Sequence, residues 1–195
     1  EGWKNLMELV SRSFLDTASD GAPHLKLDWL QGHAGGLIAL TGGPSGPIDR
    51  ALAAGSHDQA EQRLATLAEL FGDRLYVEIQ RHGVAEERRV ETALIELAYR
   101  LDLPLVAANE PFFAGQDDYE AHDALICIAE GRLVAEGDRR QLTPEHRFRT
   151  RAEMMALFAD LPEALANTVE IARRCAYRPR TVKPILPRFT MERDE

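Results

Sequence analysis

Residues 75–80, LYVEIQ, and residues 103–108, LPLVAA, decide the fold of this chain. Apolar and polar side chains alternate over 75–80 with the two-residue period of a β-strand, and 103–108 is a short apolar run typical of a buried strand. Between them, Val90 and Leu94 lie on one helical face, which predicts a helix over 84–100. This order predicts a βαβ unit, whose strands are parallel.

The same order of strand and helix begins earlier in the chain. Residues 36–41, GLIALT, read as a third buried strand. Ser56 and Gln59 have the spacing of a helix capping box, and the helix that they begin is expected to end at Gly72. The fold class is therefore α/β with parallel strands over residues 36–108. Because three strands cannot close a barrel, the sheet is either open or has its opening strands outside this sequence.

Helices and one extended segment flank this α/β region. An amphipathic helix is predicted over 3–16, and residues 25–30 fit either a short strand or the start of a helix. Near the C-terminus, residues 150–153, TRAE, form a second capping box, and Pro162 is expected to separate two helices. From Tyr177 onward prolines alternate with basic residues, which predicts an extended basic strap.

The composition limits the class of protein. With 195 residues, 45% of them hydrophobic, the chain is large enough for one sizeable core and has no apolar run of membrane-spanning length. It begins without Met, so we expect a segment of a longer polypeptide. Cys127 and Cys175 match no metal-binding spacing, which fits a reducing, cytoplasmic location. The net charge of −9 combines an acidic region up to residue 131 with an Arg-rich region over 132–188, and the Arg-rich region is the better suited to phosphate groups.

Three strand ends are candidate binding positions, because ligands of parallel α/β folds gather at the C-terminal ends of strands. The first, TGGPSG at 41–46, is a phosphate-binding loop or, more simply, a tight turn; it lacks the Gly-Lys-Ser/Thr of a P-loop. The second, QRHG at 80–83, offers one histidine beside an arginine, which is a weak indication of a metal ligand. The third, at 107–123, is the richest in potential ligands.

This third stretch, AANEPFFAGQDDYEAHD, raises the question of a metal site. Its polar side chains of the kinds found around metals are Asn109, Glu110, Asp117, Asp118, His122 and Asp123. Asp118 and His122 are four residues apart, so they share a helix face as a ligand pair or as an ordinary surface hydrogen bond. One pair is too few for a tight site, and Phe112, two residues after Glu110, cannot coordinate an ion. The residues favour a site without metal and leave the alternative open.

Several blocks of the sequence carry a family resemblance. They are GWKNLMELVSRSF (2–14), YVEIQRHG (76–83), LPLVAANEPFF (104–113), DDYEAHDALICIAEG (117–131), FADLPEALANTVEIARRC (158–175) and ILPRF (185–189). Their order resembles the alpha subunits of bacterial DNA polymerase III, the C-family replicative polymerases. The resemblance covers nearly the whole chain, and the block at 158–175 is its most specific part.

The resemblance implies a fragment of a polymerase. Residues 1–140 correspond to the later part of the N-terminal PHP domain, an irregular βα barrel, and residues 141–195 to a helical connection toward the polymerase palm. The parent protein is implied to be a DNA-directed DNA polymerase of DNA replication, a nucleotidyltransferase that uses Mg²⁺. Its catalytic residues lie outside this sequence, in which we expect no catalytic residue and no cofactor. The implied partners are a DNA primer-template, a proofreading exonuclease subunit docked on the PHP domain, and a sliding clamp bound through other regions.

The resemblance also implies a degenerate metal site. Family members with a PHP metal site use a Cys after the Ser/Thr-Gly turn and an Asp-x-His at the later strand end. Here these positions hold Gly43, Glu110 and Phe112, so two of the three ligands are lost. In members with such a site the domain serves as scaffold and docking surface. The alternatives are a metal-dependent phosphoesterase or proofreading activity using Glu110 and His122, and a stand-alone α/β binding protein.

The basic strap is the remaining candidate site. Arg178, Arg180 and Lys183 lie in a stretch without acidic residues, and we predict that some of them face DNA in the full polymerase. The alternative is that basic side chains here stabilise the C-terminus of the helix ending near Cys175.

Overall fold

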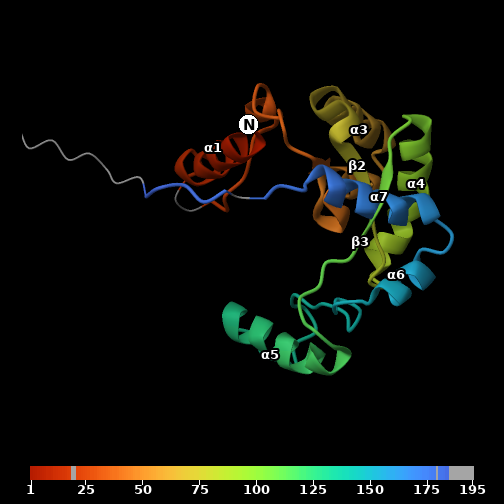
Figure 1. Cartoon of the computed structure of the whole chain (residues 1–195). Coiled ribbons are helices and arrows are strands. Elements are labelled where there is room, and N and C mark those ends of the chain that lie inside the picture. The colour runs from red at the N-terminus through yellow and green to blue at the C-terminus, as the bar shows by residue number, and fades with distance from the viewer. Residues whose placement is uncertain (19–20, 179, 185–195) are drawn as a thin grey trace, which may run out of the picture.

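The computed structural model describes residues 1–18, 21–178 and 180–184. In chain order the strands and α-helices are α1 (Gly2–Leu15), β1 (Ala39–Leu40), α2 (Pro47–Ala53), α3 (His57–Phe71), β2 (Leu75–Gln80), α4 (Ala85–Arg100), β3 (Leu105–Ala108), α5 (Tyr119–Glu130), α6 (Arg151–Leu157) and α7 (Pro162–Arg174) (Figure 1).

The three strands form a parallel sheet in the order β1-β2-β3. Val77 of β2 pairs with Leu105 of β3, and Ala39 of β1 pairs with Leu75. All six residues of the central strand β2 are buried. Leu75, Val77 and Ile79 lie in the hydrophobic core, whereas Glu78 and Gln80 on the other face hydrogen-bond to each other, and Glu78 also to the turn after β1. The predicted α/β class with parallel strands is confirmed.

The predicted strand over 36–41 was too long. Only Ala39 and Leu40 form β1, and Leu40 is 41% exposed, so this strand is not buried as expected. The reason lies just before it, where Gly36 has φ +72° and its backbone packs directly on that of Gly2. A Cβ on Gly2 would lie 2.0 Å from the Gly36 carbonyl oxygen, so this close approach of the start of α1 prevents regular strand geometry before residue 39.

Most of the predicted helices are confirmed, with local differences. The helix after Ser56 forms and ends at Gly72, but the Ser56 side chain makes no capping hydrogen bond. In contrast, Thr150 and Glu153 form the predicted capping box of α6. The short helix α2 was not predicted, although Pro47 at its first position favours a helix start. For residues 25–30, where strand and helix were left open, the structure has a 3-10 helix at Leu27–Leu30.

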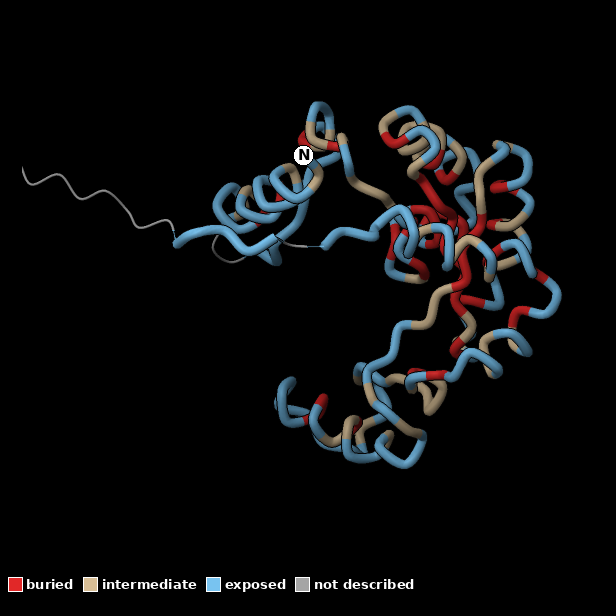
Figure 2. The backbone as a smooth tube through the Cα atoms, in the orientation of Figure 1, coloured by how far each residue is buried: buried red, intermediate tan, exposed pale blue. Residues whose placement is uncertain are grey.

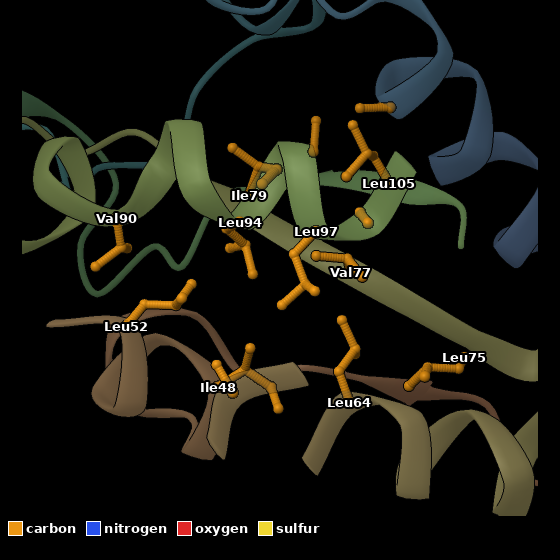
Figure 3. Packing of buried hydrophobic residues seen from close by; sticks show 14 of the residues in the cluster. Ile48, Leu52, Leu64, Leu75, Val77, Ile79, Val90, Leu94, Leu97 and Leu105 are labelled. Atoms are coloured by element: carbon orange, nitrogen blue, oxygen red, sulfur yellow. The ribbon is translucent and has the colours of Figure 1, made fainter. Parts of the chain in front are cut away.

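The hydrophobic core lies between the sheet and the helices α2, α3 and α4 (Figure 3). Ile48, Leu64, Val77 and Leu94 are at most 1% exposed and come from four different elements. Helix α7 covers β3 and adds Ala164 to the same cluster, so the C-terminal helices are part of this core. The boundary predicted at residue 140 between two functional regions stays a prediction.

Two helices stand apart from this core. Figures 1 and 2 show α1 and α5 at the periphery, each with exposed segments. The predicted helix over 3–16 is confirmed as α1, but its apolar residues Trp3 and Phe14 are 71% and 66% exposed, whereas Leu9 is buried. Across the ranges that the structure describes, no helix has the length and apolar character needed to cross a membrane.

Candidate functional site

The three strand ends line one cavity of about 660 Å³. The turn after β1, the end of β2 with the start of α4, the segment after β3, and residues 140–146 each form part of its wall. This arrangement agrees with the expectation that polar residues gather at the C-terminal ends of parallel strands. The lining residues include Gly42, Glu78, Gln80, Glu86, Glu87, Asn109, Glu110, Phe112, Arg140 and His146.

A buried hydrogen-bond network joins His82 to Glu87 at one side of this cavity. His82 is fully buried, and the Glu110 backbone N–H donates to its Nε2 at 3.3 Å. The ring proton of neutral His82 therefore lies on Nδ1, which donates to Glu87 Oε1 at 2.8 Å. Glu87 Oε2 accepts from the backbone N–H groups of His82 at 2.6 Å and Val84 at 3.3 Å. Burial acts to raise the pKa of Glu87, but the hydrogen bonds from His82 and Val84 hold it below its ordinary value.

His146 stacks on His82, with ring centroids 4.1 Å apart and planes 12° from parallel. Its Nδ1 accepts from the Thr143 backbone N–H at 3.1 Å, which leaves Nε2 as the protonated nitrogen of the neutral ring. Thr143 Oγ1 donates to the His82 carbonyl oxygen at 2.6 Å. Burial, together with the neighbouring His82, lowers the pKa of His146, so its neutral form is favoured. The segment around residue 143 is thus fastened to the end of β2.

A second network joins the turn after β1 to the end of β2. Glu78 accepts from the Gly42 backbone N–H at 3.1 Å and from Gln80 Nε2 at 2.6 Å. The Glu78 backbone N–H in turn donates to Thr41 Oγ1 at 2.9 Å. The glycine-rich stretch therefore meets a carboxylate, which disfavours a phosphate at this turn and supports the simpler interpretation as a tight turn.

The three positions interpreted as a degenerate metal site lie around the same cavity. Gly43 has φ +54°, and a Cβ built on it would lie 2.6 Å from the Gln80 side-chain amide. Glu110 uses its backbone to bind His82, and its side chain is exposed. The Phe112 ring lies 6.0 Å from the His146 ring and 5.9 Å from the Arg140 guanidinium. Of the three positions, Glu110 alone carries a group that coordinates metals, so the residues present do not fit the family's metal site.

The remaining polar side chains of 107–123 are dispersed. Asp118 caps its own turn by accepting from the Gly115 N–H at 3.0 Å. Asp123 binds Arg139 through two hydrogen bonds of 2.6 Å. His122 lies beside Phe112 and Phe113, with ring centroids 5.7 and 5.4 Å away. Within the described ranges, no three His, Cys, Asp or Glu side chains form a group suited to a metal ion.

The described residues of the basic strap, 177, 178 and 180–184, are exposed. Arg178, Arg180 and Lys183 are all exposed, and their predicted contact with DNA stays a prediction. In the turn before them, Arg174 donates to the Asp73 carbonyl oxygen at 2.7 Å and to the Tyr76 hydroxyl at 3.1 Å. Arg174, the last residue of α7, therefore joins this helix to the segment before β2 and to β2 itself. It precedes the strap, so the helix-stabilising alternative for the strap residues also stays a prediction.

Sequence reasoning missed the residues that form the buried networks. His82 was considered only as a weak ligand, and Glu87 and His146 were not singled out. Glu87 had a usable signal, since it stands three residues after Val84, the residue preceding α4, as the glutamate of a capping box does. His146 had none, because its contact with His82 spans more than sixty residues and arises from the tertiary fold.

Comparison with known proteins gives the family context of this site. A sequence model of the PHP domain matches residues 1–82. The chain is 47% identical over 188 residues to the "DNA polymerase III subunit alpha" of Caulobacter vibrioides, an alignment that covers 96% of the chain. It is 40% identical over 190 residues to the protein of that name from Pseudomonas aeruginosa and 39% identical over 188 residues to that from Rickettsia bellii. Each alignment covers 16% of the relative, so the chain spans about a sixth of their length. The resemblance inferred from the sequence is confirmed.

Proposed function

By sequence similarity the chain belongs to the DNA polymerase III alpha subunit family, as a segment of its PHP-domain region; from this premise, we propose that it is a non-catalytic scaffold of a replicative DNA polymerase. In this proposal the parent protein synthesises DNA on a primer-template with Mg²⁺, through residues outside this segment. The PHP-type region, up to about residue 140, holds a degenerate metal site, and residues from 141 lead toward the polymerase palm.

The proposal rests on the side chains found at and beside the three positions of the family's metal site. The Gln80 amide fills the space that a side chain at position 43 would need, and φ +54° at Gly43 strains any replacement by an L-residue. Phe112 presents an aromatic ring where the family's histidine would coordinate. At these three positions a metal ion would therefore meet a single carboxylate, that of Glu110, in place of three ligands.

Protein donors already satisfy the two buried carboxylates of the cavity wall. Glu87 accepts three hydrogen bonds and Glu78 accepts two, all within the chain. A buried carboxylate that is fully hydrogen-bonded in this way needs no metal ion to compensate its charge. This supports a rigid scaffold. We further propose that its outer surface docks the proofreading exonuclease subunit, while the sliding clamp binds elsewhere on the full protein.

Metal content and hydrolysis test the proposal. The full-length protein, dialysed against manganese or zinc, should retain less than one ion per PHP domain and should hydrolyse no phosphodiester. Glu110→Ala should leave both readouts unchanged, as should Glu86→Ala, a control that alters another glutamate of the same cavity. One tightly bound ion that Glu110→Ala or His122→Ala removes, while Glu86→Ala retains it, would establish the phosphoesterase alternative instead.

The docking role has a separate test. Purified exonuclease subunit should bind the full-length alpha protein. It should lose that binding when the whole PHP-type region, together with α6 and α7, which share its core, is replaced by an unrelated domain. Unchanged binding after this replacement would refute the docking role, and it would leave the assignment of a degenerate metal site untouched.

A further inference from the structure

A second, much smaller cavity of about 10 Å³ lies beside the main one. Asp49 of α2, Glu78 and Gln80 of β2, and Glu87 of α4 form its polar wall. Its volume is close to that which one water molecule occupies, since about 10–15 Å³ is the minimum for a water-sized sphere. The cavity is too small for an organic ligand.

Asp49 is the unusual residue of this wall. It is only 5% exposed, and within the described part of the chain its Oδ1 has no hydrogen-bond partner. Leaving a buried polar atom unpaired carries the full cost of removing it from water, so such atoms are normally paired with protein or ordered water. The unpaired oxygen and the adjacent cavity together indicate an occupant that donates a hydrogen bond.

The groups around the cavity supply acceptors. Gln80 Nε2 donates to Glu78, which leaves the Gln80 amide oxygen as an acceptor. The Glu87 carboxylate accepts from His82 and has no proton to give. Glu91 of α4, which also borders the cavity, binds Arg81.

The nearby cations are also engaged elsewhere. Besides Glu91, Arg81 binds Asp160 at 2.7 Å, and Arg63 of α3 donates to the Pro47 carbonyl oxygen at 2.9 Å. Arg50, the neighbour of Asp49 on α2, is exposed. Asp49 therefore faces Glu78 and Glu87, and no cation of residues 1–18, 21–178 and 180–184 is paired to it. This arrangement favours a water molecule and a proton over a bare carboxylate.

We propose that this cavity holds one water molecule, which donates to Asp49 Oδ1 and to a neighbouring acceptor, and that Asp49 takes up a proton there in mildly acidic solution. Burial and, second, the charge of Glu78 raise the pKa of Asp49 from 3.8 to about 6. Because this pKa is raised in the folded state, the fold binds the proton more tightly than the unfolded chain does between pH 4 and 6. Stability therefore falls as pH rises through this window. This inference is independent of the proposed polymerase role.

Asp49→Asn tests the proposal, because it keeps the shape of the side chain and removes its charge. We expect the melting temperature of D49N, relative to that of the parent, to rise as pH rises from 4 to 7.5. At pH 7.5 D49N should melt several degrees higher. Asp58→Asn, at an exposed position on α3, is the matched control and should follow the parent. Identical pH profiles of parent and D49N would overturn the proposal.

Two direct measurements complete the test and do not depend on a variant. The side-chain carboxyl ¹³C resonance of Asp49 in the parent should titrate near pH 6, and a midpoint below pH 4.5 would overturn the proposal. Nuclear Overhauser effects between water protons and protein protons should reveal one long-lived water molecule beside Asp49. If instead Mg²⁺ or Na⁺ alone raises the melting temperature of the parent and has no effect on D49N, the cavity holds a cation and the water assignment is wrong.

Discussion

Removing the carboxylate of Glu87 should be among the most destabilising polar substitutions in this chain. Glu87 is 4% exposed and accepts from three donors, namely His82 Nδ1 and the backbone N–H groups of His82 and Val84. In Glu87→Ala all three donors lose their partner. The two His82 donors are buried and the Val84 N–H is half-buried. Since each unsatisfied buried donor costs about 1–3 kcal/mol, the two His82 donors alone predict a loss of about 2–6 kcal/mol from the free energy of unfolding. That is a large share of the ~5–15 kcal/mol that stabilises a typical domain.

Glu87→Gln separates the charge from the hydrogen bonds. The glutamine oxygen can still accept from the two backbone N–H groups, but its amide nitrogen cannot accept from His82 Nδ1. His82 cannot simply change tautomer, because its Nε2 already accepts from the Glu110 N–H. One donor therefore remains unpaired, and we expect a loss of about 1–3 kcal/mol. Glu86→Gln, one residue away and exposed, is the control and should cost under ~0.5 kcal/mol.

Urea unfolding at several pH values is the measurement. Because the pKa of Glu87 is lowered in the folded state, its contribution is present above the ordinary value of 4.5. It is lost as pH falls through the folded value. The difference between parent and Glu87→Gln should accordingly shrink below pH 4.5. The reasoning is refuted if Glu87→Ala costs less than the Gln variant, or if Glu86→Gln costs as much as either.

Two further predictions concern basic residues. Arg81→Lys should lower the free energy of unfolding by about 1–3 kcal/mol in urea titrations, because lysine cannot reproduce the paired hydrogen bonds that Arg81 gives to Glu91 and Asp160; an unchanged midpoint would contradict this. If the full-length protein is the polymerase that we propose, neutralising Arg178, Arg180 and Lys183 together should weaken its binding to primer-template and flatten the salt dependence by roughly one unit of slope per lost phosphate contact. A fall in melting temperature with unchanged DNA affinity would instead assign the strap a structural role.

Local patterns were sufficient to predict the regular core of the fold. The period of β2, the apolar face of α4 and the Thr150–Glu153 capping box are each encoded within a few neighbouring residues, and each was predicted correctly. The extent of β1 depends on contact between Gly36 and Gly2, which are distant in sequence. No local pattern reports such a contact, so the strand was predicted too long.

The sequence predicted where the candidate site lies, but only some of the side chains that form it. The strand ends predicted the cavity, and the family resemblance drew attention to Gly43 and Phe112. The hydrogen bonds of the carboxylates could not be predicted, because their partners are distant in the sequence. One example is the Gly42 N–H that donates to Glu78. Spacing along the chain grouped Asp118 with His122, whereas in the structure Asp118 caps its own turn.

If the family's metal site is degenerate, as we propose, the buried carboxylates must be stabilised without a metal ion. Glu78 and Glu87 are held by donors of the chain itself, and the Gln80 amide that donates to Glu78 also fills the space beside Gly43. A side chain at position 43 would need to displace that amide, and Glu78 would then lose a hydrogen bond. Under this proposal, the lack of a ligand at position 43 and the stabilisation of Glu78 are therefore structurally linked. Asp49 differs from these two carboxylates, because its buried Oδ1 accepts from no donor of the described chain. This is why we propose that Asp49 binds a water molecule and takes up a proton.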